Sequence, residues 1–100
     1  MSASIASGNP QLSVVVPVHN EEDNVTPLVG EIVAALRGVI SFEIVYVDDT
    51  SRDATLQRLR DLQATTPELR VIRHLSNAGQ STAVRNGVKA ARAPWIATLD

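Results

Sequence analysis

Runs of apolar residues along the chain predict four β-strands. The first run, residues 12–18, holds five aliphatic side chains in seven positions, and four of them are Val. A continuous β-branched run without alternation is typical of a parallel strand that is covered on both faces. Residues 42–47, 69–74 and 95–99 form three further runs. Because Pro17 has no amide hydrogen for a sheet ladder, we expect the pairing of the first strand to end there.

Apolar positions at helical spacing fill the segments between these strands. The first stripe follows the spacing i, i+3, i+4, i+7, i+8 and i+11, and its members are Val25, Leu28, Val29, Ile32, Val33 and Leu36. We expect Asp23 or Asn24 to cap this helix and Pro27 to lie in its first turn, where amides lack intrahelical partners. A second helix is expected to begin at a capping box of Thr50 and Asp53, and a third helix follows later in the chain.

This alternation of strands and helices indicates an α/β fold. Short connections between successive strands imply right-handed crossovers, so we expect a parallel sheet with helices on both faces. Residues 1–11 are rich in Ser, Ala, Asn and Pro and lack the pattern of a secretory signal, so they are expected to form a flexible tail. No covering helix follows the last strand. Residues 12–100 are therefore expected to be the N-terminal, nucleotide-binding part of a larger, here truncated, catalytic domain.

Composition and charge narrow the functional classes. The chain has 100 residues, of which 44% are hydrophobic and 20% charged, as in ordinary soluble domains. Nine Lys and Arg stand against 11 Asp and Glu, and only three residues are aromatic, so there is no basic footprint for nucleic acid. Cysteine is absent, which fits a reducing, cytoplasmic compartment. No apolar run within residues 1–100 approaches the roughly 20 residues of a membrane span.

Polar and acidic residues gather where the predicted strands end. His19, Asn20 and Glu21 follow the first strand, and Asp48 and Asp49 follow the second. The segment before the third helix and the end of the fourth strand add Asn77, Ala78, Gly79, Gln80, Ser81 and Asp100. In open α/β sheets, ligands bind at the carboxyl edge of the strands. Acids at successive strand ends suit a sugar nucleotide with a divalent cation, which takes oxygen ligands.

Each of these residues also has a purely structural interpretation. Residues 21–23 would complement the dipole at a helix N-terminus. Asp48 or Asp49 would cap the following helix, although only one of the pair is needed for that. His19 would be a loop residue, and Gly79 would serve as a turn glycine.

Four ordered motifs together point to a family. They are VVVPVHNEE at 14–22, VDDTSRDAT at 47–55, NAGQSTA at 77–83 and WIATLD at 95–100. These motifs resemble those of the family 2 inverting glycosyltransferases, and most closely those of the dolichyl- or polyprenyl-phosphate sugar transferases. The resemblance covers residues 12–100, and four motifs in the right order make it specific.

The resemblance implies a GT-A fold, a Rossmann-like sheet with the nucleotide at its carboxyl edge. It implies that Pro17, Asn20 and Glu21 line the nucleotide pocket. It also implies that Asp49, with Asp48 beside it, contacts the base. These assignments are carried over from the motifs that hold the residues.

The same resemblance extends the expected site and shows two departures. His19, Gly79 and Gln80 are expected at the nucleotide, and Asp100 would be the first acid of an Asp-x-Asp motif that holds Mg²⁺ or Mn²⁺ on the diphosphate. His19 stands where Tyr or Phe is common, which affects packing against the base or ribose. Thr50 replaces the usual Gly.

The implied activity is transfer of a sugar from a UDP- or GDP-linked donor to an acceptor, expected to be a polyprenyl phosphate, by an inverting, metal-assisted mechanism. We expect the 100-residue piece alone to be inactive. A full-length protein would work at the cytoplasmic face of the inner membrane, held there by parts beyond residue 100.

Two other functions remain open at this point. A sugar-nucleotide-binding module without catalytic activity would use the same edge residues. A phospho-accepting receiver domain also places an acid pair after one strand and a lone Asp after another, as Asp48, Asp49 and Asp100 do. Against the receiver, a strand with its own acidic loop precedes the pair, and the loop at 77–83 has no role there.

Overall fold

The computed structural model describes residues 9–74, 76 and 78–99, and these form one parallel sheet between two helical layers. In chain order the elements are β1 (Leu12–Val18), α2 (Glu22–Leu36), β2 (Phe42–Asp49), α3 (Thr55–Gln63), β3 (Leu69–His74), α4 (Gln80–Ala90) and β4 (Trp95–Thr98). The strands are arranged in the order β3-β2-β1-β4, and every pair is parallel. The predicted α/β class is confirmed.

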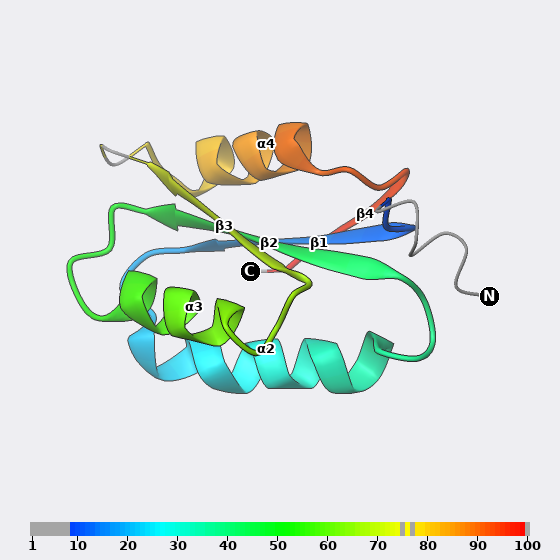
Figure 1. Ribbon diagram of the computed structural model, residues 1–100. Helices are drawn as coiled ribbons and strands as arrows, with labels where there is room; N and C mark the ends of the chain where they lie inside the picture. The colour runs from blue at the N-terminus through cyan, green and yellow to red at the C-terminus, as the bar shows by residue number, and fades with distance from the viewer. Residues whose placement is uncertain (1–8, 75, 77, 100) are drawn as a thin grey trace.

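The helices cover both faces of the sheet, as predicted. Figure 1 shows α2 and α3 together below the sheet and α4 alone above it. On the lower face, side chains of β1 and β2 form a core with the two helices, which includes Val16, Val29, Tyr46 and Leu59. Each fully buried aliphatic side chain of this kind contributes about 1.5–3 kcal/mol.

The upper face holds a smaller core. Val15, Val45 and Val47 pack against Ala83 of α4. Gly87 faces the same strands, and a Cβ placed on it would lie 2.4 Å from Cγ1 of Val15. This glycine therefore allows α4 to lie close to the sheet.

Pro17 does not end the pairing of β1, so that expectation is wrong. Pro17 and Val18 still pair with β2, opposite Val47 and Asp48. The amide of Leu99 donates to the carbonyl of Val15, so the backbone N–H and C=O groups of odd-numbered residues in β1 face β4. Pro17 thus turns its missing amide toward β4, beyond the last paired residue on that side. A proline is tolerated there because no ladder hydrogen bond is lost.

The helix starts also differ from the expected caps. Helix α2 begins at Glu22, so neither Asp23 nor Asn24 is its N-cap. Pro27 is consequently the sixth helical residue and lies inside the helix. Its missing amide would have bonded the carbonyl of Asp23, which lies in an exposed turn where water can replace that bond.

The predicted capping box before α3 is not formed. The helix starts at Thr55, and Thr50 lies five residues earlier with a φ of 55°. Asp53 instead accepts a hydrogen bond from the amide of Thr55 at 2.9 Å, which satisfies a donor of the first turn. The acidic pair, Asp48 and Asp49, lies in the last two positions of β2 rather than in a loop.

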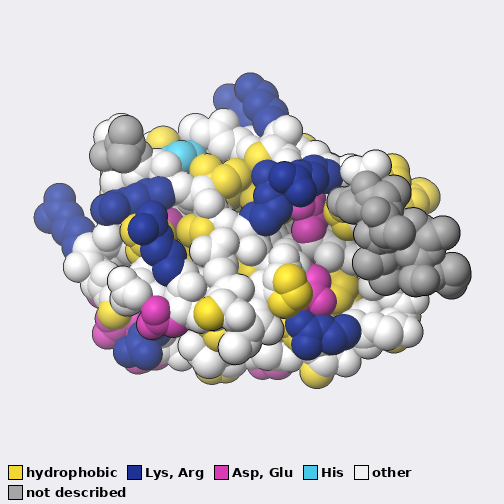
Figure 2. All heavy atoms as spheres, viewed as in Figure 1, with side chains coloured by type: hydrophobic (Ala, Val, Ile, Leu, Met, Phe, Trp, Pro, Cys, Tyr) yellow, Lys and Arg dark blue, Asp and Glu magenta, His cyan; other side chains and the backbone are white. Residues whose placement is uncertain are grey.

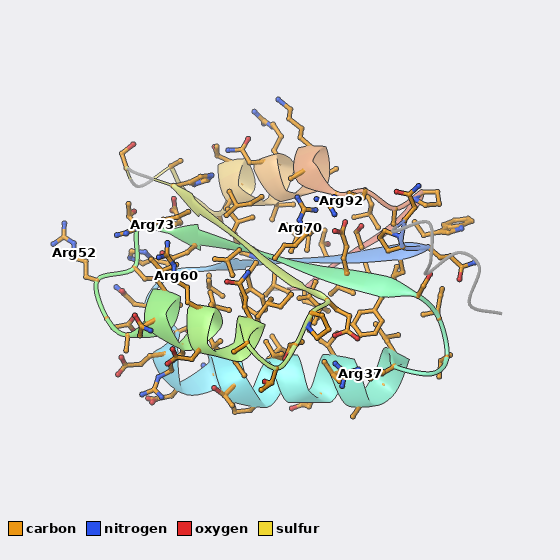
Figure 3. The ribbon with its side chains drawn as sticks, viewed as in Figure 1. Arg37, Arg52, Arg60, Arg70, Arg73 and Arg92 are labelled. Atoms are coloured by element: carbon orange, nitrogen blue, oxygen red, sulfur yellow. The ribbon has the colours of Figure 1, made fainter. Side chains whose placement is uncertain are left out.

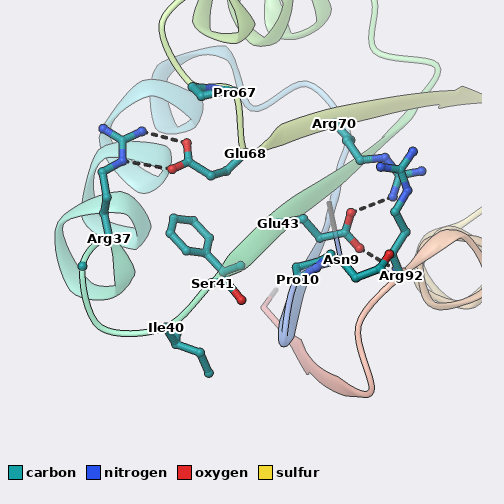
Figure 4. Close-up of a pocket in the computed structure, with 12 residues that line it drawn as sticks. Asn9, Pro10, Arg37, Ile40, Ser41, Glu43, Pro67, Glu68, Arg70 and Arg92 are labelled. Atoms are coloured by element: carbon teal, nitrogen blue, oxygen red, sulfur yellow. Dashed lines mark hydrogen bonds and ion pairs between the residues drawn. The ribbon is translucent and has the colours of Figure 1, made fainter. Parts of the chain in front are cut away.

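A cluster around the buried Glu43 lies at the amino edge of the sheet. Glu43 is 5% exposed and accepts hydrogen bonds from the Ser13 hydroxyl at 2.6 Å, the Arg70 guanidinium at 2.7 Å and the Arg92 amide at 2.7 Å. Burial alone would raise the pKa of Glu43, but these donors outweigh it and hold that pKa below the ordinary value. Figure 4 shows this cluster beside a cavity of about 370 Å³, with the Arg37–Glu68 ion pair on its other side.

Candidate nucleotide site at the carboxyl edge

The loops after β1 and β2 are tied together by short hydrogen bonds. His19 Nδ1 lies 2.7 Å from the carbonyl oxygen of Asp49, and because a carbonyl only accepts, Nδ1 carries the hydrogen. The Asn20 amide donates to the Ser51 hydroxyl at 2.9 Å, and the Arg52 amide donates to Asn20 Oδ1 at 2.8 Å. The two predicted motifs at 14–22 and 47–55 thus form one surface.

Two residues of this surface adopt a left-handed backbone. Asn20 has a φ of 53°, and Thr50 has a φ of 55°. Asparagine tolerates this region, but a β-branched residue such as Thr50 is strained there by about 1–2 kcal/mol. Glycine adopts the conformation without strain, which gives a physical reason for the Gly that is usual at the position of Thr50. Such strain is typical of functional sites.

The acids at the start of α2 connect two helices. The amide of Ala54 donates to Glu22 Oε1 at 2.8 Å, and the amide of Glu22 donates to Asp53 Oδ2 at 3.3 Å. Glu21, predicted at the nucleotide, is exposed; its amide donates to the Thr55 hydroxyl at 2.9 Å, and its carboxylate accepts from the Asn24 side chain at 3.3 Å. Glu22 and Asp53 therefore have structural roles.

The two adjacent acids of β2 differ in their surroundings. Asp48 is fully buried, and its Oδ2 accepts from the Ser51 amide at 3.3 Å. Within the part of the chain that the structure describes, Oδ1 of Asp48 has no hydrogen-bond partner. Oδ1 is therefore an acceptor that a ligand could use. Leaving a buried oxygen unpaired costs free energy, which favours such a bond.

Asp49 organises the segment before α4. Its Oδ1 accepts from the Ala78 amide at 2.9 Å and lies 3.0 Å from His74 Nδ1, and its Oδ2 accepts from the Gly79 amide at 2.9 Å. Asp49 is 5% exposed, and this burial would raise the pKa of the carboxyl. The bonds from Ala78, His74 and Gly79 outweigh burial and lower the pKa.

A cavity opens at this edge of the sheet. Its volume is about 630 Å³, and its lining comprises His19, Asn20, Thr50, Ser51, Arg52, Arg73 and Ser76. The surface view shows Lys and Arg side chains over the same end of the molecule, where Figure 3 labels Arg52, Arg60 and Arg73 (Figure 2). The edge thus combines hydrogen-bonding loops with positive charge, which suits an anionic ligand.

The structure brings together only part of the predicted site in this cavity. His19 and Asn20 line it, whereas the predicted residues Pro17, Glu21, Asp48, Asp49, Gly79 and Gln80 are not among its lining residues. Gly79 precedes α4 with a φ of 86°, and Gln80 is the first residue of the helix. Asn77 and Asp100 lie outside the described residues, so the predicted metal ligand has no described position.

Sequence reasoning missed Ser51, Arg52, Arg73 and Ser76 as lining residues. Arg52 lies within the motif at 47–55, and that position alone was a signal. No sequence motif pointed to Arg73. Only the register of β3 against β2 shows that Arg73 lies opposite Asp48, near the ends of both strands.

The described residues contain neither a metal-binding cluster nor a membrane span. Among residues 9–74, 76 and 78–99, no three His, Cys, Asp or Glu side chains are grouped so that they could hold a metal ion. No helix in the same ranges is long and apolar enough to cross a membrane.

Comparison with known proteins decides the family. Residues 13–100 match the model of glycosyl transferase family 2. The chain belongs to glycosyl transferase family 2. This confirms the resemblance of the four motifs and excludes the receiver-like alternative.

Two relatives carry a polyprenyl phosphate in their names. The chain is 40% identical to the dodecaprenyl-phosphate galacturonate synthase of Rhizobium johnstonii, over 90% of this chain and 27% of that protein. It is 37% identical to the dolichol-phosphate mannosyltransferase of Pyrococcus furiosus, over 90% of this chain and 25% of that protein. The chain therefore spans about a quarter of the length of these family 2 relatives.

Solved structures of glycosyltransferases share the fold. The S. aureus TarS 1–349 structure in complex with UDP gives a TM-score of 0.80 at 28% identity, over 90% of this chain and 27% of that one. The mannosyltransferase PcManGT from Pyrobaculum calidifontis, in complex with GDP-Man and Mn²⁺, gives a TM-score of 0.72 at 25% identity, over 83% and 25% of the two chains. The predicted GT-A fold is confirmed, and the chain spans about a quarter of the length of these solved chains.

Proposed function

We propose that the full-length protein transfers a sugar from a nucleotide diphosphate sugar to a polyprenyl phosphate with inversion at the anomeric carbon. The cavity at the carboxyl edge is the main observation behind this proposal. It is lined by the loops after β1 and β2, which hydrogen bonds join to each other, and the ionised Asp49 lies beside these loops. The names of the relatives support the acceptor, and the UDP and GDP-Man complexes of the neighbours support the donor.

Recognition of the nucleotide is assigned to groups that accept or donate at this edge. An ionised carboxylate only accepts, so Asp49 suits the N–H groups of a base or the hydroxyls of a ribose. Asp48, next to Asp49 in the chain, has a buried oxygen without a partner among the described residues, and this oxygen is a second acceptor at the edge. The exposed side chains of His19 and Asn20 lie on the cavity wall, and His19 stands where the family motif commonly has Tyr or Phe.

The remaining assigned residues shape the pocket. Pro17 fixes the backbone as the chain leaves β1, and Glu21 presents an exposed carboxylate at the start of α2. Gly79 and Gln80 form the N-terminal end of α4, where a helix dipole favours negative charge on a ligand. The roles of Pro17 and Glu21 are carried over from the family motifs.

A divalent cation, Mg²⁺ or Mn²⁺, is assigned to Asp100. When bound, such an ion would offset the charge of the departing nucleoside diphosphate. Asp100 lies outside the described residues, and oxygens of the diphosphate would serve as further ligands of the ion. The Mn²⁺ complex of the Pyrobaculum neighbour supports this choice of ions.

The acceptor determines whether a base is required. A phosphate monoester has a second pKa of about 6, so a polyprenyl phosphate is largely ionised near neutral pH and is already a nucleophile. Its oxygen would attack the anomeric carbon on the face opposite the leaving diphosphate, which inverts the configuration. No protein base is then essential for this step.

A transfer assay on the full-length protein tests the proposal. Radiolabelled UDP- and GDP-sugars are incubated with polyprenyl phosphate, and the lipid phase is counted with and without EDTA. We expect labelled lipid that depends on the metal, and loss of most of it in Asp100→Ala. Polyprenol in place of polyprenyl phosphate is the control acceptor and should remain unlabelled.

The same assay separates the enzyme from a binding module. Donor binding by calorimetry without transfer to any lipid phosphate would favour the non-catalytic alternative. Transfer at an undiminished rate after EDTA treatment would contradict the assignment of Asp100.

A further inference from the structure

His74 lies between the acidic edge of β2 and helix α4. It is the last residue of β3, and its side chain is 11% exposed. Nδ1 lies 3.0 Å from Asp49 Oδ1, and Nε2 lies 2.9 Å from the side-chain nitrogen of Asn86 on α4. The ring therefore bridges a strand and a helix through Asp49 on one side and Asn86 on the other.

The bonding partners define which nitrogen carries the hydrogen. Asp49 has a lowered pKa, so it is ionised at neutral pH and can only accept. Nδ1 of His74 must then donate to it. In the neutral ring, Nε2 accepts from the amide nitrogen of Asn86, so both ring nitrogens are occupied.

The two carboxylate oxygens of Asp49 accept different numbers of hydrogen bonds. Among the described residues, Oδ1 takes two donors, from His74 and from the Ala78 amide, whereas Oδ2 takes one, from the Gly79 amide. A carboxylate oxygen accepts about two hydrogen bonds. Oδ1 is therefore saturated, and Oδ2 keeps capacity for one further donor.

We propose that His74 is a positioning residue of the nucleotide site, which fixes the carboxylate of Asp49 so that Oδ2 accepts from an N–H or O–H group of the nucleoside. The inference rests on the proposed function, because it assumes that Asp49 meets the nucleotide. Without His74, Oδ1 has one donor fewer, and the carboxylate can rotate or turn Oδ1 to the ligand with the wrong geometry.

Two substitutions of similar polarity separate positioning from general stability. In His74→Asn, the side-chain amide nitrogen is bonded to Cγ, as Nδ1 is, so it can still donate to Asp49. In His74→Gln, the amide nitrogen lies one bond further out, closer to the place of Nε2, and the bond to Asp49 is lost. Asn86→Ala removes the other neighbour of the ring and leaves the His74 bond to Asp49 in place.

Nucleotide affinity of the full-length protein is measured by calorimetry with UDP, GDP and their sugar conjugates, together with the melting temperature of each variant. We expect His74→Gln to weaken binding about tenfold, and His74→Asn and Asn86→Ala to stay within about threefold of wild type. Equal weakening in the Asn and Gln variants, or wild-type affinity in the Gln variant, would overturn the positioning role.

Amide hydrogen exchange without nucleotide gives a second readout. The amides of Ala78 and Gly79 should exchange faster in His74→Gln than in His74→Asn, because they donate to the carboxylate that His74 holds. Unchanged exchange would overturn the proposal. If the wild type binds none of the nucleotides, the proposed function fails, and the effect of His74 on Asp49 is decided by exchange alone.

Discussion

Asp49 combines a structural and a proposed recognition role in one side chain. Three donors hold its carboxylate, so the residue both links β2 to the start of α4 and keeps a negative charge at the carboxyl edge. The sequence suggested either a capping or a binding role for the acid pair. Within the described part of the chain, Oδ2 has a single donor, the Gly79 amide, so a bond to the helix start and a bond to a ligand are compatible.

Asp49→Asn should weaken sugar-nucleotide binding by the full-length protein by about 1–3 kcal/mol, the range for losing a charge-assisted hydrogen bond. The variant should also melt at a lower temperature, because an amide cannot accept on both arms from Ala78, Gly79 and His74. Calorimetric titration checks the first effect. Asp61→Asn on α3 is the matched control and should bind as wild type does, and unchanged affinity in Asp49→Asn would remove Asp49 from the nucleotide site.

Glu43 contributes stability that depends on pH. Because its pKa is lower in the folded chain than in the unfolded chain, its contribution is present above the unfolded value of about 4.3 and is lost as the pH falls through the folded pKa. Asp49 and Asp53 have lowered pKa values too and act in the same direction. The fold should therefore lose stability on acidification below about pH 4.

Glu43→Gln should reduce the free energy of unfolding at pH 7 by about 1–3 kcal/mol, because Arg70 and Ser13 lose a buried charged acceptor. The difference from wild type should shrink as the pH falls below 4. Urea unfolding at pH 7 and at pH 3.5 measures both values. Glu68→Gln, which breaks the more exposed pair with Arg37, should have a smaller effect at pH 7; a larger effect there would contradict the account.

At the scale of elements, the packing of α4 depends on small side chains. Ala83 and Gly87 face the valines of β1 and β2, and both are buried. Valine is stiff at χ1 and cannot turn aside in a fully packed strand. The close approach also sets the position of the start of α4, where Gly79 donates to Asp49.

Gly87→Ala should destabilise the fold by about 1–3 kcal/mol through overpacking, since the new Cβ would lie 2.4 Å from Cγ1 of Val15 and 3.0 Å from Cγ2 of Val47. Gly30→Ala in α2 is the matched control. A Cβ there would meet nothing within 4 Å, and the higher helix propensity of Ala should stabilise by about 0.5–1 kcal/mol. Equal melting temperatures of the two variants would show that α4 does not pack as closely as described.

The elements themselves were predictable because apolar runs and stripes report local burial. The first residues of the helices were not predictable, because amides at the start of α2 and just before α3 donate to side chains from the other helix start. Glu22 accepts from Ala54, and Asp53 accepts from Glu22, across 31–32 residues of sequence. A cap read from adjacent residues cannot include such a partner. The bonds of Asp49 to His74 and Gly79 have the same long-range character.

At the scale of the whole molecule, β4 borders the described sheet. It pairs with β1 on one side, and its Trp95 and Ile96 are 72% and 41% exposed. The sequence predicted the strand and its parallel pairing. Which strand it joins was not predictable, because the order β3-β2-β1-β4 is set by the crossovers and not by local pattern.

Residues 1–100 expressed alone should associate through this open edge, since unpaired apolar strands pair with one another. Light scattering is expected to show oligomers, and Ile96→Lys should shift them toward the monomer. Arg73→Lys on β3, the other edge strand, is the control and should leave association unchanged. A monomer with a sharp cooperative melt would mean that β4 needs no further cover.

The nucleotide is proposed to bind at the carboxyl edge of β1 and β2. A crystal structure of the full-length protein with UDP or GDP, whichever binds in calorimetry, tests it most directly. We expect the nucleoside to lie against His19 and Asn20, with an N–H or O–H group within hydrogen-bond distance of Asp49 Oδ2. Nucleotide density in the amino-edge cavity between Arg37 and Arg92, with the carboxyl edge empty, would contradict it.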